Sequence, residues 1–80
     1  MSDTEHKKKL VVGVKQTMRM LEKGMVSNIY VAEDADFFVT RTVIEAATAA
    51  DIPIIPVESK KELGRMCGIE IGTATAGTLI

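Results

Sequence analysis

Residue types that support disulfide bonds, metal sites or membrane insertion are scarce in this chain. Its 80 residues include one cysteine, one histidine and no tryptophan. A single cysteine excludes an internal disulfide and fits a reducing compartment, so we expect a cytoplasmic protein. No apolar run approaches the roughly 20 residues that a membrane-spanning helix needs, and Met1 to Lys9 is too polar for a secretory signal. We therefore expect no membrane partner.

The residues that could carry catalysis lack the partners that catalysis needs. His6 stands alone near the N-terminus, which supports neither a metal site nor general-base chemistry. Cys67 is at an apolar helix end with no histidine nearby in sequence, so a packed thiol is preferred to a nucleophile. Glu33, Asp34 and Asp36 could suggest paired acids or a cation site, but helix capping by Asp34 or Asp36 is preferred. We expect no enzyme, no metal and no cofactor.

Length and composition indicate one domain. Eighty residues leave no room for a second one, and an apolar content of 46% suits a globular core better than a disordered tail. We therefore expect a single domain over residues 1–80, with residues 1–7 frayed.

Apolar runs and helical periodicities alternate along the chain. Short apolar runs predict strands, and apolar residues at i, i+3 and i+4 between capping residues predict helices. Strands are expected at Leu10–Val12, Ile29–Ala32, Ile54–Val57 and within Thr73–Ile80, and helices from Gly13 to about Lys23, from Asp36 to Ala50 and from Lys60 to Gly68. This order predicts an α/β fold with helices on both faces of a small sheet.

The same periodicity predicts the buried helix faces and the helix ends. The residues expected to be buried are Val14, Met18, Leu21 and Met25 in the first helix, and Val39, Val43, Ala46, Ala47 and Ala50 in the second. Gly24 is the expected C-cap of the first helix. Ser59 and Glu62 have the spacing of a capping box, in which each side chain bonds the backbone of the other residue.

Charge is divided along the chain, although the net charge is only −1. Residues 6–25 carry six cations, Lys7, Lys8, Lys9, Lys15, Arg19 and Lys23, against the single acid Glu22. Residues 26–57 carry the acids Glu33, Asp34, Asp36, Glu45 and Asp51 against the single cation Arg41. The division predicts a basic and an acidic patch, and a basic patch attracts anions whatever the net charge. A scatter of solvated charges is the alternative interpretation.

The segment that opens at Gly13 is the best candidate for an anion site. Gly13 lets another backbone approach closely, and the unpaired amides and dipole at a helix start attract phosphate. Lys15, Arg19 and Lys23 follow at i, i+4 and i+8, so they form one cationic stripe. Gln16 adds an amide able to bond a base edge. The alternative is an ordinary solvated face on which Glu22 screens Arg19.

The chain resembles a known family along nearly its whole length, from about Lys8 to Leu79. Four segments carry the resemblance: Gly13–Thr17, Val31–Asp36, Val57–Lys60 and, most specifically, the run Leu-Gly-Arg-Met-Cys-Gly-Ile at 63–69. They resemble the kink-turn-binding ribosomal-protein family, the L7Ae and L30e group, and most closely its short bacterial YbxF-type members.

The resemblance implies a three-layer α/β/α sandwich with a small mixed four-stranded sheet, which binds RNA kink-turns. In a kink-turn, a bulge sharply bends a duplex stabilised by sheared G·A pairs. The family's Gly-x-Asn-Glu motif falls on Gly13 to Gln16, so Lys15 and Gln16 would face the G·A pairs and Arg19 a phosphate. Asp36 and Lys60 match positions near the extruded bulge nucleotide, and the loop that would cover this nucleotide by apolar contact is Ile69, Glu70, Ile71, Gly72 and Thr73. The resemblance also implies a monomer that is associated with the ribosome.

The sequence departs from the family's archaeal and eukaryotic pattern at two points. Lys15 and Gln16 replace an Asn-Glu pair, which removes an acceptor carboxylate and adds an ammonium able to donate to guanine O6 or N7. Phe37 stands where many relatives have proline. The lost Asn-Glu pair and the acidic middle segment leave a second hypothesis open, a protein-interaction module of a ribonucleoprotein without independent RNA recognition.

Overall fold

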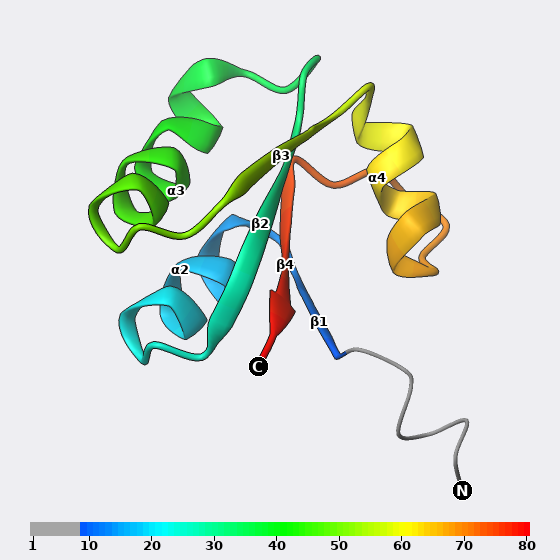
Figure 1. Cartoon of the computed structure of the whole chain (residues 1–80). Coiled ribbons are helices and arrows are strands. Elements are labelled where there is room, and N and C mark those ends of the chain that lie inside the picture. Colours follow the sequence, from blue (N-terminus) through cyan, green and yellow to red (C-terminus); the bar gives the residue numbers. More distant parts are fainter. Residues whose placement is uncertain (1–8) are drawn as a thin grey trace, which may run out of the picture.

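The computed structural model describes residues 9–80, in which strands and helices alternate (Figure 1). The elements are β1 (Leu10–Val12), α2 (Val14–Glu22), β2 (Val26–Ala32), α3 (Phe37–Ala49), β3 (Ile54–Val57), α4 (Lys60–Cys67) and β4 (Thr75–Leu79). This order is the predicted one; β2 begins earlier than expected, and β4 lies within the expected range Thr73–Ile80. His6, Lys7, Lys8 and the stretch 1–7 that was expected to be frayed lie outside the described residues.

The strands form one mixed sheet in the order β1-β4-β2-β3. β4 lies between β1 and β2 and is antiparallel to both, with Gly77 opposite Val11 and Ala76 opposite Tyr30. β3 is parallel to β2, with Ile55 opposite Tyr30. Because β1 and β2 both run against β4, the strands β1, β2 and β3 all point the same way.

Helices cover both faces of this sheet: α2 and α3 lie on one face and α4 on the other (Figure 1). The core beneath α2 and α3 is built from Leu21, Val26, Ile29, Val43 and Ala47. The core beneath α4 is built from Ala32, Val57, Leu63 and Ala76. Side chains alternate along a strand, so β2 can supply Ile29 to one core and Ala32 to the other. Residues 9–80 therefore form the predicted three-layer α/β/α sandwich.

The buried face of α2 differs from the prediction at its end. Leu21 is buried, but Met25 is 44% exposed. The helix ends at Glu22 and the chain turns at Gly24, whose φ of 70° is left-handed, so the helical period no longer applies at Met25. Thr17, which apolar periodicity does not select, is fully buried.

The buried face of α3 is centred on Val43 and Ala47, as predicted, but its two outer members are wrong. Val39 is 43% exposed, because Thr40 takes the inward position one residue later. Ala50 is exposed because it is the C-cap, beyond the last full turn of the helix. Helix α3 therefore buries a narrower stripe than the prediction gave it.

Side chains cap the starts of α3 and α4 as the sequence predicted. The amide of Phe38 donates to Asp36 Oδ1 at 2.9 Å, and the amide of Glu62 donates to Ser59 Oγ at 3.0 Å. The Glu62 carboxylate differs from the expected capping box, because its Oε1 accepts from Arg65 Nη1 at 3.5 Å. Each cap satisfies a helix amide that has no partner within the helix.

Candidate nucleic-acid interface

One edge of the sheet collects the starts of α2, α3 and α4. Strands β1, β2 and β3 point the same way and each leads directly into a helix, so these helices begin at the carboxyl edge of the sheet. β4 runs the other way and begins at this edge, so the 69–73 loop before it returns there from α4. We call this the helix-start edge. Positive helix ends gathered in this way favour a negatively charged partner.

Hydrogen bonds from the start of β4 hold this edge together on the α2 side. The Gly13 amide donates to the Thr75 carbonyl at 2.9 Å, and the Ala32 amide donates to the Ala74 carbonyl at 2.9 Å. These bonds tie the residue after β1 and the last residue of β2 to two adjacent residues, Thr75 and Ala74. The entry to α2 is therefore fixed to the central strands of the sheet.

A second set of contacts fixes the start of α4. The Lys60 amide donates to Asp34 Oδ1 at 2.8 Å, and the Thr73 amide donates to the Lys60 carbonyl at 3.1 Å. A Cβ on Gly72 would lie 3.1 Å from the carbonyl carbon of Lys60, so the loop passes directly against the helix. Lys60, Gly72 and Thr73, which the sequence analysis assigned to one site, are thus brought together.

The start of α2 presents its amides to solvent. Gly13 has a φ of 94°, which side-chain-bearing residues rarely adopt, and no side chain caps the helix. Within residues 9–80 the amides of Val14, Lys15 and Gln16 have no hydrogen-bond partner, and Lys15 and Gln16 are exposed. Space beside Gly13 is open, since a Cβ there would meet no atom within 4 Å. This helix end is accessible to a ligand.

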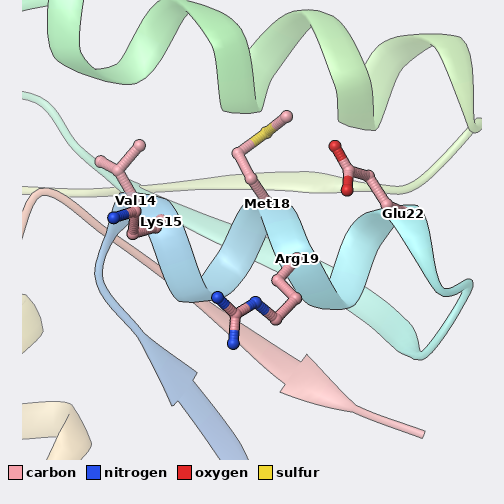
Figure 2. A pocket seen from close by; sticks show the side chains of 5 residues that line it. All are labelled: Val14, Lys15, Met18, Arg19 and Glu22. Atoms are coloured by element: carbon pink, nitrogen blue, oxygen red, sulfur yellow. The ribbon is translucent and has the colours of Figure 1, made fainter.

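Cations continue from this end along the flank of α2. Lys15 and Arg19 line a shallow hollow with Val14, Met18 and Glu22 (Figure 2). In Figure 2, Met18 and Glu22 are directed toward α3, whereas the Arg19 guanidinium lies on the other side of the helix. Among the described residues neither cation forms an ion pair, so Glu22 does not neutralise Arg19 through a salt bridge. The lining of the hollow therefore combines two apolar side chains, two cations and one carboxylate.

Lys23, the third cation of the predicted stripe, lies apart from this hollow. It is the C-cap of α2 and is exposed at the opposite end of the helix from Gly13. Of the three cations in the predicted stripe, only Lys15 and Arg19 therefore lie near the uncapped amides at the start of α2.

The 69–73 loop combines a fixed base with an exposed apolar tip. The Ile69 amide donates to the Gly64 carbonyl at 3.0 Å, and Thr73 is buried. Ile71 is 74% exposed, and Glu70 and Gly72 are exposed beside it. An isoleucine held out in solvent on an anchored loop is suited to cover an apolar ligand surface.

Two of the three carboxylates in the β2–α3 connection, those of Asp34 and Asp36, cap helices. Asp36 caps its own helix, and Asp34 caps α4 from a distance. The preferred interpretation, helix capping by Asp34 or Asp36, is confirmed, but no local pattern indicated that Asp34 would cap a different helix. Sequence analysis also missed the exposure of Phe38, which is 80% accessible next to Asp36.

The remaining chemical candidates are weak within the described part of the chain. Burial raises the pKa of the Cys67 thiol, which lowers its thiolate fraction and its reactivity at neutral pH. Over residues 9–80 no cluster of three or more histidine, cysteine or acidic side chains could hold a metal ion. None of the helices described is long and apolar enough to cross a bilayer.

Comparison with known proteins identifies the family. The profile of the "Ribosomal protein L7Ae/L30e/S12e/Gadd45 family" matches residues 1–79. Over 71 residues the chain is 44% identical to a protein named "RNA-binding protein" in Geobacillus thermodenitrificans (strain NG80-2) and 42% identical to "RNA-binding protein YbxF" of Geobacillus stearothermophilus, with coverage of 89% of this chain and 87% of each relative. The solved "Giardia lamblia 15.5kD RNA binding protein" shares the fold, with a TM-score of 0.83 and 22% identity over 89% of this chain and 60% of that one. The chain belongs to the ribosomal protein L7Ae/L30e/S12e/Gadd45 family.

Proposed function

We propose that this protein binds RNA kink-turns through the helix-start edge and stabilises their bent form, without catalytic activity. The observation that carries the proposal is the open start of α2, where unpaired amides stand beside the exposed side chains of Lys15 and Gln16. Relatives that are more than 40% identical over most of the chain are named RNA-binding proteins. We further propose that the protein acts as a cytoplasmic monomer in association with the ribosome.

A bent RNA suits this edge better than a straight duplex does. The major groove of regular A-form RNA is too narrow and deep for side chains to read, so a helix end can enter only where the groove is distorted. Phosphates near the amides of α2 and near Arg19 would position the protein, and Lys15 with Gln16 would contact base edges. Because only the kinked form offers this groove, binding shifts the RNA population toward the kink.

The opposite side of the edge would hold the extruded nucleotide. Lys60 and Asp36 lie at helix starts on either side of the sheet, and Ile71 stands exposed on the loop that is bonded to Lys60 through Thr73. Apolar cover from Ile71 would remove the base of this nucleotide from water. The Asp36 carboxylate already accepts from Phe38, so its role would be to fix the start of α3 rather than to bond the base directly.

The first test compares a kink-turn RNA with a straight duplex of matched length and base composition. In gel shifts at fixed salt and magnesium, the kink-turn should be retained at protein concentrations that leave the duplex free. Equal affinity for the two RNAs would reject kink-turn recognition. Failure to bind either RNA would instead favour the protein-interaction module, for which the exposed acids of the β2–α3 connection are the supporting feature.

Replacing Arg19 with alanine should change how binding depends on salt. Each phosphate that is neutralised releases counterions, so the loss of one contact lowers the slope of log K against log salt by roughly one. Arg19 is exposed and forms no ion pair among the described residues, so stability should not change. Affinity titrations at several salt concentrations measure the slope. An unchanged slope would mean that Arg19 contacts no phosphate.

A further inference from the structure

The first turn of α3 exposes three consecutive large apolar side chains. Phe37 is 63% exposed, Phe38 80% and Val39 43%. The core beneath α3 is built from other residues of the helix, so these three side chains are not needed to complete it. Apolar side chains held together in solvent commonly mark a surface that binds a partner. We call Phe37–Val39 the aromatic turn.

The aromatic turn is rigid. Asp36 caps it by accepting from the Phe38 amide at 2.9 Å, and the Val39 amide donates to the Asp36 carbonyl at 2.9 Å. Thr40, only 3% exposed, anchors the next position of the helix. A partner therefore meets the two rings on a preformed helical turn, which lowers the entropy cost of binding.

Three exposed carboxylates precede the aromatic turn, those of Glu33, Asp34 and Asp36. Asp36 accepts from the Phe38 amide, and Asp34 accepts from the Lys60 amide at 2.8 Å. Both donors are neutral amides, so the two carboxylates keep their negative charge and have lone pairs left for further donors. None of the three forms an ion pair within residues 9–80. The approach to the aromatic turn therefore carries three negative charges that no cation of this part of the chain neutralises.

The other charges around α3 do not reverse this sign. Arg41 is the only cation in the first two turns of α3, and its Nε lies 3.2 Å from Oε2 of Glu45. Glu22 is the charged side chain that α2 directs toward α3 (Figure 2). The exposed cations Lys15 and Lys60 stand at the starts of the other two helices. The charge around the aromatic turn is therefore mainly negative, which attracts a cationic partner.

Aromatic rings beside carboxylates favour one cation in particular, the guanidinium of arginine. It stacks on the face of an aromatic ring, whose electron density is negative, and its planar fork matches a carboxylate with two parallel hydrogen bonds. The ammonium of lysine is compact and strongly hydrated, so it gains less from both contacts. Phe38 and the carboxylate of Asp36 are two residues apart at the same helix start, so one arginine-bearing segment can use both.

We propose that the aromatic turn and the carboxylates before it dock a cationic protein segment in which arginines alternate with apolar side chains. An arginine of this segment stacks on Phe38 and bonds the carboxylate of Asp36 or Glu33. Apolar side chains of the segment cover Phe37 and Val39. The open amides of α2 take no part in this contact, so the proposal does not depend on the proposed RNA binding.

The test titrates the full chain, free of RNA, with a synthetic eight-residue peptide of alternating arginine and leucine. The peptide has no aromatic residue, so every aromatic NMR signal comes from the protein, whose two phenylalanines and one tyrosine can be assigned by substitution. The peptide should move the ring signals of Phe37 and Phe38. It should bind about threefold more tightly than the same peptide with lysine in place of arginine. A peptide with glutamate in place of arginine should not bind.

Two substitutions separate the ring contact from the charge contact. Phe38→Ala should weaken binding of the arginine peptide about three- to fivefold, and the fold should be kept because this side chain is 80% exposed. Asp36→Asn should weaken it about two- to threefold. Asparagine is as good an N-cap as aspartate, so this change removes the charge but keeps the helix start. Asp51→Asn is the matched control, because it removes the same charge just beyond the other end of α3 and should not change the affinity.

Several results would overturn the proposal. Ring signals that stay unmoved by the arginine peptide, or an affinity that survives Phe38→Ala, would show that the aromatic turn makes no contact. Equal losses in Asp36→Asn and Asp51→Asn would mean that the peptide senses only net charge. Single-stranded oligoadenylate that moves the same ring signals and displaces the peptide would assign the surface to nucleic acid instead. The expected pattern of losses would support the docking surface, whichever way the kink-turn comparison turns out.

Discussion

Replacing Gly64 with alanine should destabilise the protein by about 1–3 kcal/mol, the usual range for overpacking a well-packed site. A helix interior normally favours alanine over glycine by about 0.5–1 kcal/mol, so the expected sign is reversed. The reason is a collision, because a Cβ on Gly64 would overlap the carbonyl oxygen of Ile71 and lie 3.2 Å from the Cα of Gly72. Both are backbone atoms, which move only if the loop moves.

The loop has little freedom to retreat from α4. The Ile69 amide is bonded to Gly64 itself, and the Thr73 amide is bonded to Lys60, so both ends of the loop are fixed to the helix. Alanine at position 64 must therefore break these bonds or push the helix off the sheet. Since Ile71 is the proposed cover for the extruded nucleotide, the same change should also weaken RNA binding.

Thermal unfolding measures the effect on stability. For a domain of this size, 1 kcal/mol corresponds to a shift in Tm of roughly 4–8 °C, so Gly64→Ala should lower the Tm by several degrees or more. Arg65→Ala is the matched control, because its side chain is 72% exposed and its contact with Glu62 is a surface ion pair of little energy. A Gly64→Ala variant that melts at or above the wild-type Tm would show that the loop yields and that its close approach is unimportant.

Local signals were sufficient to predict the elements of the fold. Ser59 and Glu62 predicted the start of α4 because an N-cap acts through a bond across three residues, and that bond is present. The bounds of β3 were predicted because the run Ile54–Val57 is short, apolar and preceded by a proline. Such features depend on neighbours in sequence, so the sequence alone contains them.

Features that depend on distant contacts were not predictable from these signals. The bond from Lys60 to Asp34 joins residues 26 positions apart and exists only because β2 and β3 are parallel neighbours. Gly64 belongs to a family motif, but the need for glycine comes from the approach of Ile71 after the chain has turned back. Thr17 is buried because α2 packs on the sheet. A search for periodic apolar residues does not select a threonine, so its burial was not predicted.

In the candidate site, too, the features set by local spacing were predictable and those set by distant contacts were not. The spacing of Lys15 and Arg19 predicted a shared cationic flank, and the two residues line one hollow. Their gathering with Lys60 and the 69–73 loop at one edge follows from the antiparallel pairing of β4, which composition and periodicity do not encode. The roles of these residues toward RNA remain proposals, and Lys15 offers the most direct test.

Replacing Lys15 with alanine should weaken kink-turn binding by at least about 1 kcal/mol, the scale of one good base contact. Lys15 is exposed in the first turn of α2 and has no ion-pair partner among the described residues, so the fold should not change. Binding to a straight duplex should be nearly unaffected, because the duplex offers Lys15 no distorted groove. The loss should therefore appear in discrimination between RNAs rather than in general affinity.

Lys23→Ala is the matched control for this prediction, since it removes the same charge from the same helix. Lys23 is exposed at the C-cap, at the other end of α2 from the open amides, so its loss changes the long-range field of the protein but no base contact at the helix start. Titrations of both variants with both RNAs, at fixed salt and magnesium, separate the two effects. If Lys15→Ala loses affinity equally for the kink-turn and the duplex, or if Lys23→Ala reproduces its selectivity, then Lys15 acts only as one charge among several and base recognition must come from other residues.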